Sequence, residues 1–309
     1  MKISIVTPSF DRADYLDDTI ESVLTQAGDF DLEYVVQNAG TSPAVREILD
    51  RWESRLASGA FQPRCRRLRF QVVHERDSGM YDGINRGFAR CSGDVMAWVN
   101  SDDLYHPKAF QTVTEAFDQN PAAHWVAGTA NSFNARGSRA GFDKFPPAYS
   151  REFVRRGLYR IENLNWGMNW IPQDCSFWRA DLWRAAGGRL DERYRYAADF
   201  QLWRSFAEHA DLVKLNSFLG GYRFHGDQIT ADPQKYLSEL PPNPGMPPGW
   251  CRVYKAFGHL PKARRLIFNA RRGRPLLPYL KLEWEWLFGP TISWSFASSR
   301  WETTLTPIV

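Results

Sequence analysis

The sequence predicts an α/β protein with a mostly parallel sheet flanked by helices and with a helical C-terminal extension. Short apolar runs rich in β-branched residues alternate with segments whose apolar residues recur every three or four positions. The first pattern is typical of buried parallel strands and the second of amphipathic helices. Because strands that alternate with helices form right-handed βαβ units, we expect the strands to lie parallel in one sheet.

Each element in the first part of the chain has its own signal. The helix after the first strand carries Leu16, Ile20, Val23 and Leu24 on one face. The expected elements are, in order, strand Ile3–Val6, helix Tyr15–Gln26, strand Leu32–Val36, helix Pro43–Trp52, strand Phe70–Val73, helix Met80–Ala89, strand Val95–Val99 and a helix that starts near Pro107. Further along we expect a helix near Asp199 and a strand over Leu212–Tyr222.

The strand Val95–Val99 ends in a run of short oxygen-bearing side chains, Asn100-Ser101-Asp102-Asp103. Carboxylates are the ligands that Mg²⁺ and Mn²⁺ prefer, and open α/β sheets bind ligands at the carboxyl ends of their strands. The same run is also compatible with an Asp-rich turn that caps the following helix. Taken alone, it leaves both interpretations open.

Composition sets further bounds. A chain of 309 residues with 43% hydrophobic content is long enough for one large domain with a substantial core. Its four cysteines are widely scattered, and no signal peptide is apparent, so we expect a cytoplasmic protein. The net charge of +4 is modest, and no nucleic-acid-binding module is recognisable.

A series of motifs in a fixed order resembles the family 2 glycosyltransferases with the GT-A fold. The motifs are Ile3–Gln26, Glu75–Gly87, Ser92-Gly93-Asp94, Asn100–Asp103, Phe177-Trp178-Arg179, Gly187-Gly188, Ala198–Trp203 and Tyr222–Gly226. The resemblance covers residues 1–230 and implies a nucleotide-sugar half over 1–105 and an acceptor half over 106–230. It implies inverting transfer of a sugar from a nucleotide-diphosphate sugar to a hydroxyl of a glycan or lipid-linked saccharide.

The resemblance also implies which residues bind the nucleotide sugar. They are Thr7, Pro8, Phe10, Arg12, Asn38, Asp77, Asn85, Asn100, Ser101 and Asp103. Asn38 and Asn100 stand where relatives carry acidic residues, and an amide can pair with several bases. Asp103 is expected either to orient the donor sugar or to cap the next helix. Asp77 and Asn85 are also compatible with a glycine turn and a helix surface.

The other expected site residues bind the metal, act as the general base or contact the acceptor. The resemblance makes Asp102 and His225 the ligands of Mn²⁺ or Mg²⁺, and it makes Asp199 the general base that takes the proton of the acceptor hydroxyl. An aspartate at a helix start is also commonly only a cap. The acceptor is expected to contact Trp170, Gln173 and Asp174, because flat aromatic faces pack against sugar rings.

Two other classes of function stay open. A sugar nucleotidyltransferase would also bind a nucleotide and a metal, but it should carry a Gly-rich basic loop after the first strand, which Pro8-Ser9-Phe10-Asp11 does not supply. A carbohydrate-binding or nucleotide-binding protein could keep the fold and lose the chemistry. The sequence is also compatible with a homodimer.

The remaining expectations concern an acceptor loop in the middle of the chain and a C-terminal tail. Residues 128–169 are expected to form a mobile loop with short helices, and 231–249 a Pro-rich linker. Residues 250–309 are expected to form a helical amphipathic extension. Its basic residues between Lys262 and Arg274 precede a tryptophan-rich stretch, which favours peripheral binding to the inner face of an anionic membrane. The alternative is that this tail packs on protein.

Overall fold

The computed structural model describes residues 1–142, 145–226, 228, 232–247 and 288–308. Its elements are β1 (Lys2–Ser9), α1 (Leu16–Leu24), β2 (Ala27–Asn38), α2 (Pro43–Ala57), β3 (Arg64–His74), α3 (Met80–Phe88), β4 (Val95–Trp98), β5 (Leu104–Tyr105), α4 (Ala109–Gln119), β6 (Trp125–Phe133), β7 (Arg139–Phe142), α5 (Arg151–Arg155), η1 (Ile161–Trp166), η2 (Gln173–Cys175), β8 (Ser176–Arg179), α6 (Ala180–Ala185), α7 (Ala198–Ala207), β9 (Leu212–Arg223), α8 (Pro233–Glu239), β10 (Phe288–Ser295) and β11 (Arg300–Pro307).

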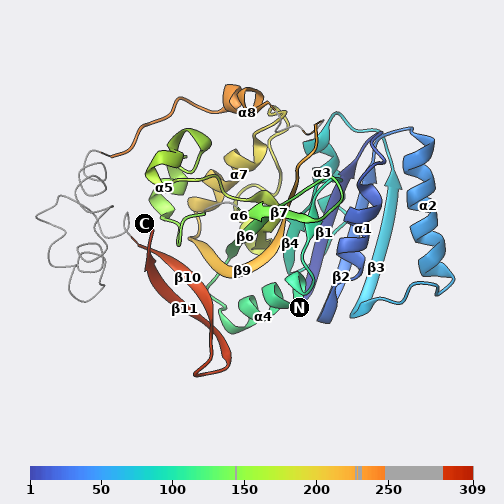
Figure 1. Cartoon of the computed structure of the whole chain (residues 1–309), viewed down its shortest axis with the longest axis horizontal. Helices are drawn as coiled ribbons and strands as arrows, with labels where there is room; N and C mark the ends of the chain where they lie inside the picture. The colour runs from blue at the N-terminus through green and yellow to red at the C-terminus, as the bar shows by residue number, and fades with distance from the viewer. Residues whose placement is uncertain (143–144, 227, 229–231, 248–287, 309) are drawn as a thin grey trace, which may run out of the picture.

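One large sheet runs through the described part of the chain (Figure 1). Its strand order is β11-β10-β9-β6-β8-β4-β1-β2-β3, with β5 paired to β9 and β7 paired to β6. The strands β3, β2, β1 and β4 are parallel to one another, whereas β8 is antiparallel to both β4 and β6. The predicted α/β class with a mostly parallel sheet is therefore confirmed.

The centre of the sheet positions the loops that matter for function. Ile5 of β1 pairs with Ala97 of β4, and both side chains are fully buried. Because β1, β2 and β4 are parallel, the loops that follow them emerge at the same edge of the sheet. The loops after β1 and β2 also touch: the Asp11 carboxylate accepts hydrogen bonds from the backbone N–H groups of Thr41 and Ser42, at 2.6 and 2.7 Å.

The expectation of a helical C-terminal extension is wrong for residues 288–307. They form a hairpin, β10–β11, whose first strand lies parallel to β9, with Thr291 opposite Lys214 (Figure 1). The reason is the period of two in this segment, where β-branched and aromatic residues alternate with polar ones, a pattern that favours strands. The rest of the expected extension, residues 250–287, lies outside the described residues.

Two other expectations about irregular segments need correction. Part of the expected linker is the helix α8, which starts where the Asp232 carboxylate accepts a hydrogen bond from the Gln234 N–H and where Pro233 occupies the first turn. Part of the expected loop over 128–169 is strand, since β6 continues to Phe133 and β7 pairs with it. The expected short helices of that region are confirmed by α5 and η1.

No helix among the described residues is both long enough and apolar enough to cross a membrane.

Candidate active site

The acidic turn after β4 meets the end of β9. His225 Nε2 lies 3.1 Å from Asp102 Oδ2, and the Arg12 guanidinium lies 4.0 Å from the same oxygen. The His225 ring is largely buried and packs on Tyr15, with ring centroids 4.7 Å apart. A carboxylate, an imidazole and a guanidinium thus converge at the carboxyl edge of the sheet.

Arg223, two residues before His225, holds this corner together. Its side chain is buried and donates hydrogen bonds to the backbone oxygens of Asp102 and Ala135, each at 3.0 Å. It also pairs with Asp18 at 2.8 Å and lies over the Tyr15 ring. The backbone of Asp102 is therefore fixed by a cation that arrives from β9. Sequence reasoning did not single out Arg223, although it lies inside the Tyr222–Gly226 motif.

Asp103 points into the protein. Its carboxylate accepts hydrogen bonds from the Arg223 backbone N–H and from the Asn100 amide, both at 3.1 Å. Burial, reinforced by the charges of Asp102 and Asp174, raises the pKa of Asp103 well above its usual range. Asp103 does not cap α4, which begins after Lys108 with no side-chain cap. Ser101 lies half-buried in the same turn.

The donor set of this corner fits a hard divalent cation. Asp102 offers a carboxylate and His225 an imidazole, both ligands that Mn²⁺ accepts. Asn100 Oδ1 is buried and has no hydrogen-bond partner among the described residues, so a further oxygen faces the same turn. Within that part of the chain, no group of three or more His, Cys, Asp or Glu side chains could hold a metal by itself. Donor oxygens from a bound ligand are needed to complete a coordination shell.

The residues expected to bind the base lie at the ends of β1 and β2. Thr7 and Pro8 are buried, and the Thr7 hydroxyl is 3.0 Å from the Tyr34 hydroxyl. Phe10 is 65% exposed, so its ring is available to a ligand. The Asn38 amide nitrogen is 3.1 Å from His74 Nδ1 and donates to the Gly40 carbonyl at 3.2 Å. The structure therefore brings an exposed aromatic ring and a buried amide to the same edge.

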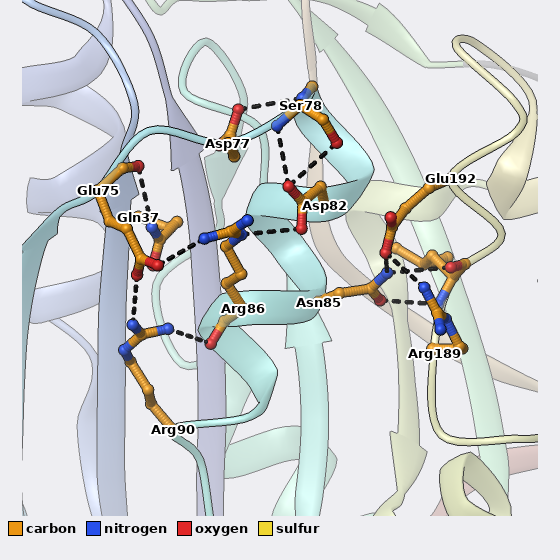
Figure 2. Close-up of polar contacts among 12 residues, drawn as sticks. Gln37, Glu75, Asp77, Ser78, Asp82, Asn85, Arg86, Arg90, Arg189 and Glu192 are labelled. Atoms are coloured by element: carbon orange, nitrogen blue, oxygen red, sulfur yellow. Dashed lines mark hydrogen bonds and ion pairs between the residues drawn. The ribbon is translucent and has the colours of Figure 1, made fainter.

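Asp77 lies just before the helix α3, and Asn85 lies within it (Figure 2). Asp77 accepts a hydrogen bond from the Gly79 N–H at 3.1 Å, and burial raises the pKa of its carboxyl. The Asn85 side chain forms hydrogen bonds with the N–H and the carbonyl of Leu190 and with the Glu192 carboxylate. Figure 2 shows this amide pointing from α3 toward the segment that carries Arg189 and Glu192. Asn85 therefore links the nucleotide half of the chain to the loop ahead of α7.

Asp199 lies in the first turn of α7, as the sequence indicated. Desolvation by burial raises the pKa of its carboxyl to about 6, although the Tyr236 hydroxyl donates a hydrogen bond to Oδ1 at 3.2 Å. A carboxylate with that pKa is mostly ionised at neutral pH and is more basic than an exposed aspartate. The first turn of α7 therefore carries a carboxylate suited to accept a proton.

Of the three residues expected to contact the acceptor, Gln173 and Asp174 lie together near the acidic turn, whereas Trp170 lines a separate small cavity. Gln173 lies against the acidic turn: its amide donates to the Trp98 carbonyl at 2.7 Å, and its Oε1 is 3.5 Å from the Asn100 amide. Asp174 is buried beside it, 3.3 Å from the Cys175 thiol. Trp170 is half-buried and packs edge-on against Phe145, and it lines a small cavity together with Tyr236.

A larger cavity of about 640 Å³ opens between the start of α3, the segment 186–193 and α7. Its walls include Ser78, Arg189 and Gln201, and Ala198, next to Asp199, lines it as well. The cavity offers both hydrogen-bonding and apolar surface beside the helix that bears Asp199.

The fold and this site define a glycosyltransferase, and comparison with known proteins gives its family. The chain belongs to glycosyl transferase family 2, whose family model matches residues 4–180. One solved structure that this chain resembles in architecture is S. aureus TarS, residues 1–349, in complex with UDP-GlcNAc. That structure superposes with a TM-score of 0.55 at 13% identity, over 92% of this chain and 77% of TarS 1–349.

Curated relatives are distant in sequence. The uncharacterized glycosyltransferase EpsJ of Bacillus subtilis is 25% identical over 75% of this chain and 64% of its own length. The uncharacterized glycosyltransferase alr2836 of Nostoc is 26% identical over 38% of this chain and 33% of its length. The chondroitin synthase of Pasteurella multocida is 22% identical over 86% of this chain but only 26% of its own length. The chain thus spans 64% of the length of EpsJ and 33% of the length of alr2836.

Proposed function

We propose that this glycosyltransferase is an inverting enzyme that moves a sugar from a nucleotide-diphosphate sugar to a hydroxyl of a glycan or lipid-linked saccharide. The observation that carries the proposal is the pairing of Asp102 with His225 at the carboxyl edge of the sheet. A carboxylate beside an imidazole at this place has a chemical use, because together they can hold a divalent cation whose positive charge pairs with the diphosphate of a nucleotide sugar. Two similar proteins point the same way: S. aureus TarS was crystallised with UDP-GlcNAc, and a chondroitin synthase is a relative.

In this proposal Asp102 and His225 hold Mn²⁺ or Mg²⁺ together with the diphosphate of the donor. The cation, when bound, acts as a Lewis acid that stabilises the negative charge growing on the leaving diphosphate. Arg12, whose guanidinium is 4.0 Å from the Asp102 carboxylate, would contact the same phosphates. Arg223 keeps the Asp102 backbone in place through its hydrogen bond to the carbonyl oxygen.

Asp199 is the proposed general base. Its carboxylate takes the proton of the acceptor hydroxyl while the hydroxyl oxygen forms a bond to the anomeric carbon. The bond from that carbon to the diphosphate breaks on the opposite face, and the configuration inverts. The pKa of about 6 keeps Asp199 ionised at neutral pH while making it a stronger base than a solvated aspartate.

We also propose that the enzyme works in the cytoplasm at the inner face of an anionic membrane. The support is the basic and aromatic sequence between Lys262 and Phe288, which suits an interface with anionic lipids. A lipid-linked saccharide would be presented at that surface. Most of this segment lies outside the described residues.

A donor screen followed by a turnover assay tests the function. Thermal shifts measured with UDP-, GDP- and dTDP-sugars, with and without Mn²⁺, should identify the donor, because a ligand that binds only the folded state raises its stability. With that donor, we expect release of free nucleoside diphosphate. A thermal shift with no release would indicate a binding protein, and formation of a nucleoside triphosphate when pyrophosphate is added would indicate a nucleotidyltransferase.

The variant Asp199→Asn tests the base directly. We expect unchanged donor affinity and a fall in turnover of about 10²-fold or more, the range for losing a general base. Asp118→Asn, at an exposed position of α4, is the matched control and should behave like the wild type. If donor affinity and turnover collapse together, Asp199 is a donor-side residue and the base lies elsewhere.

A further inference from the structure

The start of α7, from which Asp199 projects, has no side-chain cap from the residue before it. The residue before the helix is Ala197, which has no side chain able to accept a hydrogen bond, and the helix has no side-chain cap. The first N–H groups of a helix have no partner inside it, and they need an acceptor from elsewhere. This start also carries Asp199, whose carboxylate is placed by the backbone around it.

The segment that leads into α7 is held by α8. The Glu239 carboxylate accepts hydrogen bonds from the N–H groups of Arg195, Tyr196 and Ala197, at 2.8, 2.8 and 2.9 Å. A carboxylate at this position also interacts favourably with the positive end of the helix dipole. Glu239 therefore anchors, from another element, the three residues that lead into α7.

The same helix contacts the Asp199 side chain. Tyr236, one turn before Glu239, donates its hydroxyl hydrogen to Asp199 Oδ1 at 3.2 Å. The segment that follows α8 is tied down as well, since the buried Arg160 donates to the Pro241 carbonyl at 3.0 Å. Two side chains of one short helix thus fix both the backbone and the carboxylate of the proposed base.

We propose that α8 is the positioning element of the general base: Tyr236 orients the Asp199 carboxylate, and Glu239 fixes the backbone from which it projects. This inference rests on the proposed role of Asp199 as the base. Neither Tyr236 nor Glu239 touches the reacting atoms in this proposal. Both act through Asp199.

The groups that face Asp199 make the inference measurable. Tyr236 and Glu239 face it from α8, and Tyr81 faces it from α3. The positive charge of Arg160 lowers the pKa of Tyr236. The Tyr236 hydrogen bond favours the ionised carboxylate and lowers the pKa of Asp199, whereas the negative charge of Glu239 raises it. Removing one contact or the other should therefore move this pKa in opposite directions.

The experiment is a pH titration of the aspartate side-chain carbons by nuclear magnetic resonance, with the Asp199 signal assigned by its loss in Asp199→Asn. In Tyr236→Phe we expect the pKa of Asp199 to rise, and in Glu239→Gln we expect it to fall. Turnover of the donor found in the screen should follow, with the acidic limb of its pH profile moving up and down respectively and with the donor KM unchanged. Tyr149→Phe is the matched control, because the Tyr149 hydroxyl is buried without a hydrogen-bond partner among the described residues.

Each result decides between the alternatives. Opposite shifts in the two variants, with none in Tyr149→Phe, support the positioning role. An unchanged Asp199 titration in Tyr236→Phe overturns it, even if activity falls. Glu239→Gln tests the same helix separately if the first variant folds poorly. If Asp199→Asn keeps its turnover while the titrations shift as expected, the proposed base is wrong although the contacts are real.

Discussion

His225 Nε2 lies 3.1 Å from Asp102 Oδ2, although 123 residues separate the two in the sequence. The contact exists because β9, which ends just before His225, returns to the sheet beside β6 and pairs with β5, the short strand that follows Asp102. The acidic turn and the histidine are thereby fixed to each other by the strand order. Any metal or diphosphate bound at Asp102 would also meet His225.

The first prediction concerns this pair. Asp102→Asn should abolish the Mn²⁺-dependent part of donor binding, because it removes the charge that holds a cation, while an amide of the same shape keeps the packing. Isothermal titration with the donor, with and without Mn²⁺, measures the effect. Asp118→Asn serves again as the control. Unchanged Mn²⁺ dependence in Asp102→Asn would remove Asp102 from the proposed metal site.

The second prediction concerns Arg223, the cation behind Asp102. Arg223→Met should lower the free energy of unfolding by about 2–4 kcal/mol, because it leaves the carbonyls of Asp102 and Ala135 without their donors. Asp18→Asn removes only the outer partner of Arg223, which is 53% exposed, and should cost less than about 1 kcal/mol. Urea unfolding of both variants makes the comparison. Equal losses would mean that the ion pair, rather than the carbonyl contacts, stabilises this corner.

The third prediction links the site to stability. The pKa of Asp199 is raised from 3.8 to about 6, so the folded state disfavours its ionised form. The stability of the wild type should therefore fall as pH rises through that window, and Asp199→Asn should escape this loss. At about pH 7.5 we expect its Tm to exceed that of the wild type by about 2–4 °C, with the difference shrinking toward about pH 4. A lower Tm for the variant at both pH values would contradict the desolvation argument.

The fourth prediction tests whether the C-terminal hairpin belongs to the sheet. A Cβ atom added at Gly289 would lie 2.0 Å from the Tyr149 carbonyl oxygen, so Gly289→Ala must displace β10 or the backbone around Tyr149. Thermal unfolding should show a marked loss of Tm. Gly226→Ala is the control, because a Cβ atom there has nothing within 4 Å. Equal Tm values for the two variants would show that β10 is held loosely.

The fifth prediction addresses the membrane. Truncation after Pro248 would delete β10, which pairs with β9, and could therefore disturb the fold. Charge substitutions in the tail test membrane binding without deleting a strand. Replacing Lys262, Arg264 and Arg265 by Gln should weaken salt-sensitive flotation with liposomes rich in anionic phosphatidylglycerol, since each cation contributes about 1 kcal/mol. Liposomes of neutral phosphatidylcholine are the control. Wild-type protein that does not float with anionic liposomes at low salt would refute membrane association.

Much of the fold was predictable from the sequence, because local patterns determine local structure. Apolar runs alternate with segments whose apolar residues recur at helical spacing, and this pattern predicted the elements from β1 to β4 and the parallel direction of their strands. The position of the acidic run Asn100–Asp103 at the end of β4 was predictable, but the run alone left a ligand site and an Asp-rich turn equally open. The C-terminal hairpin was not predicted, because the amphipathic character of residues 250–309 favours a helix. The spacing of apolar residues changes to two only near Phe288.

What the sequence by itself determined was therefore which residues are candidates for chemistry: the family resemblance pointed to Asp102, Asp199 and His225 from their types and their motifs. The tertiary structure decided which of them meet. The pairing of His225 with Asp102, the hydrogen bond from Arg223 to the Asp102 backbone, and the contact of α8 with Asp199 depend on strand order and on packing between distant segments. No local pattern encodes such contacts, because the free energy that selects them comes from burying the whole sheet.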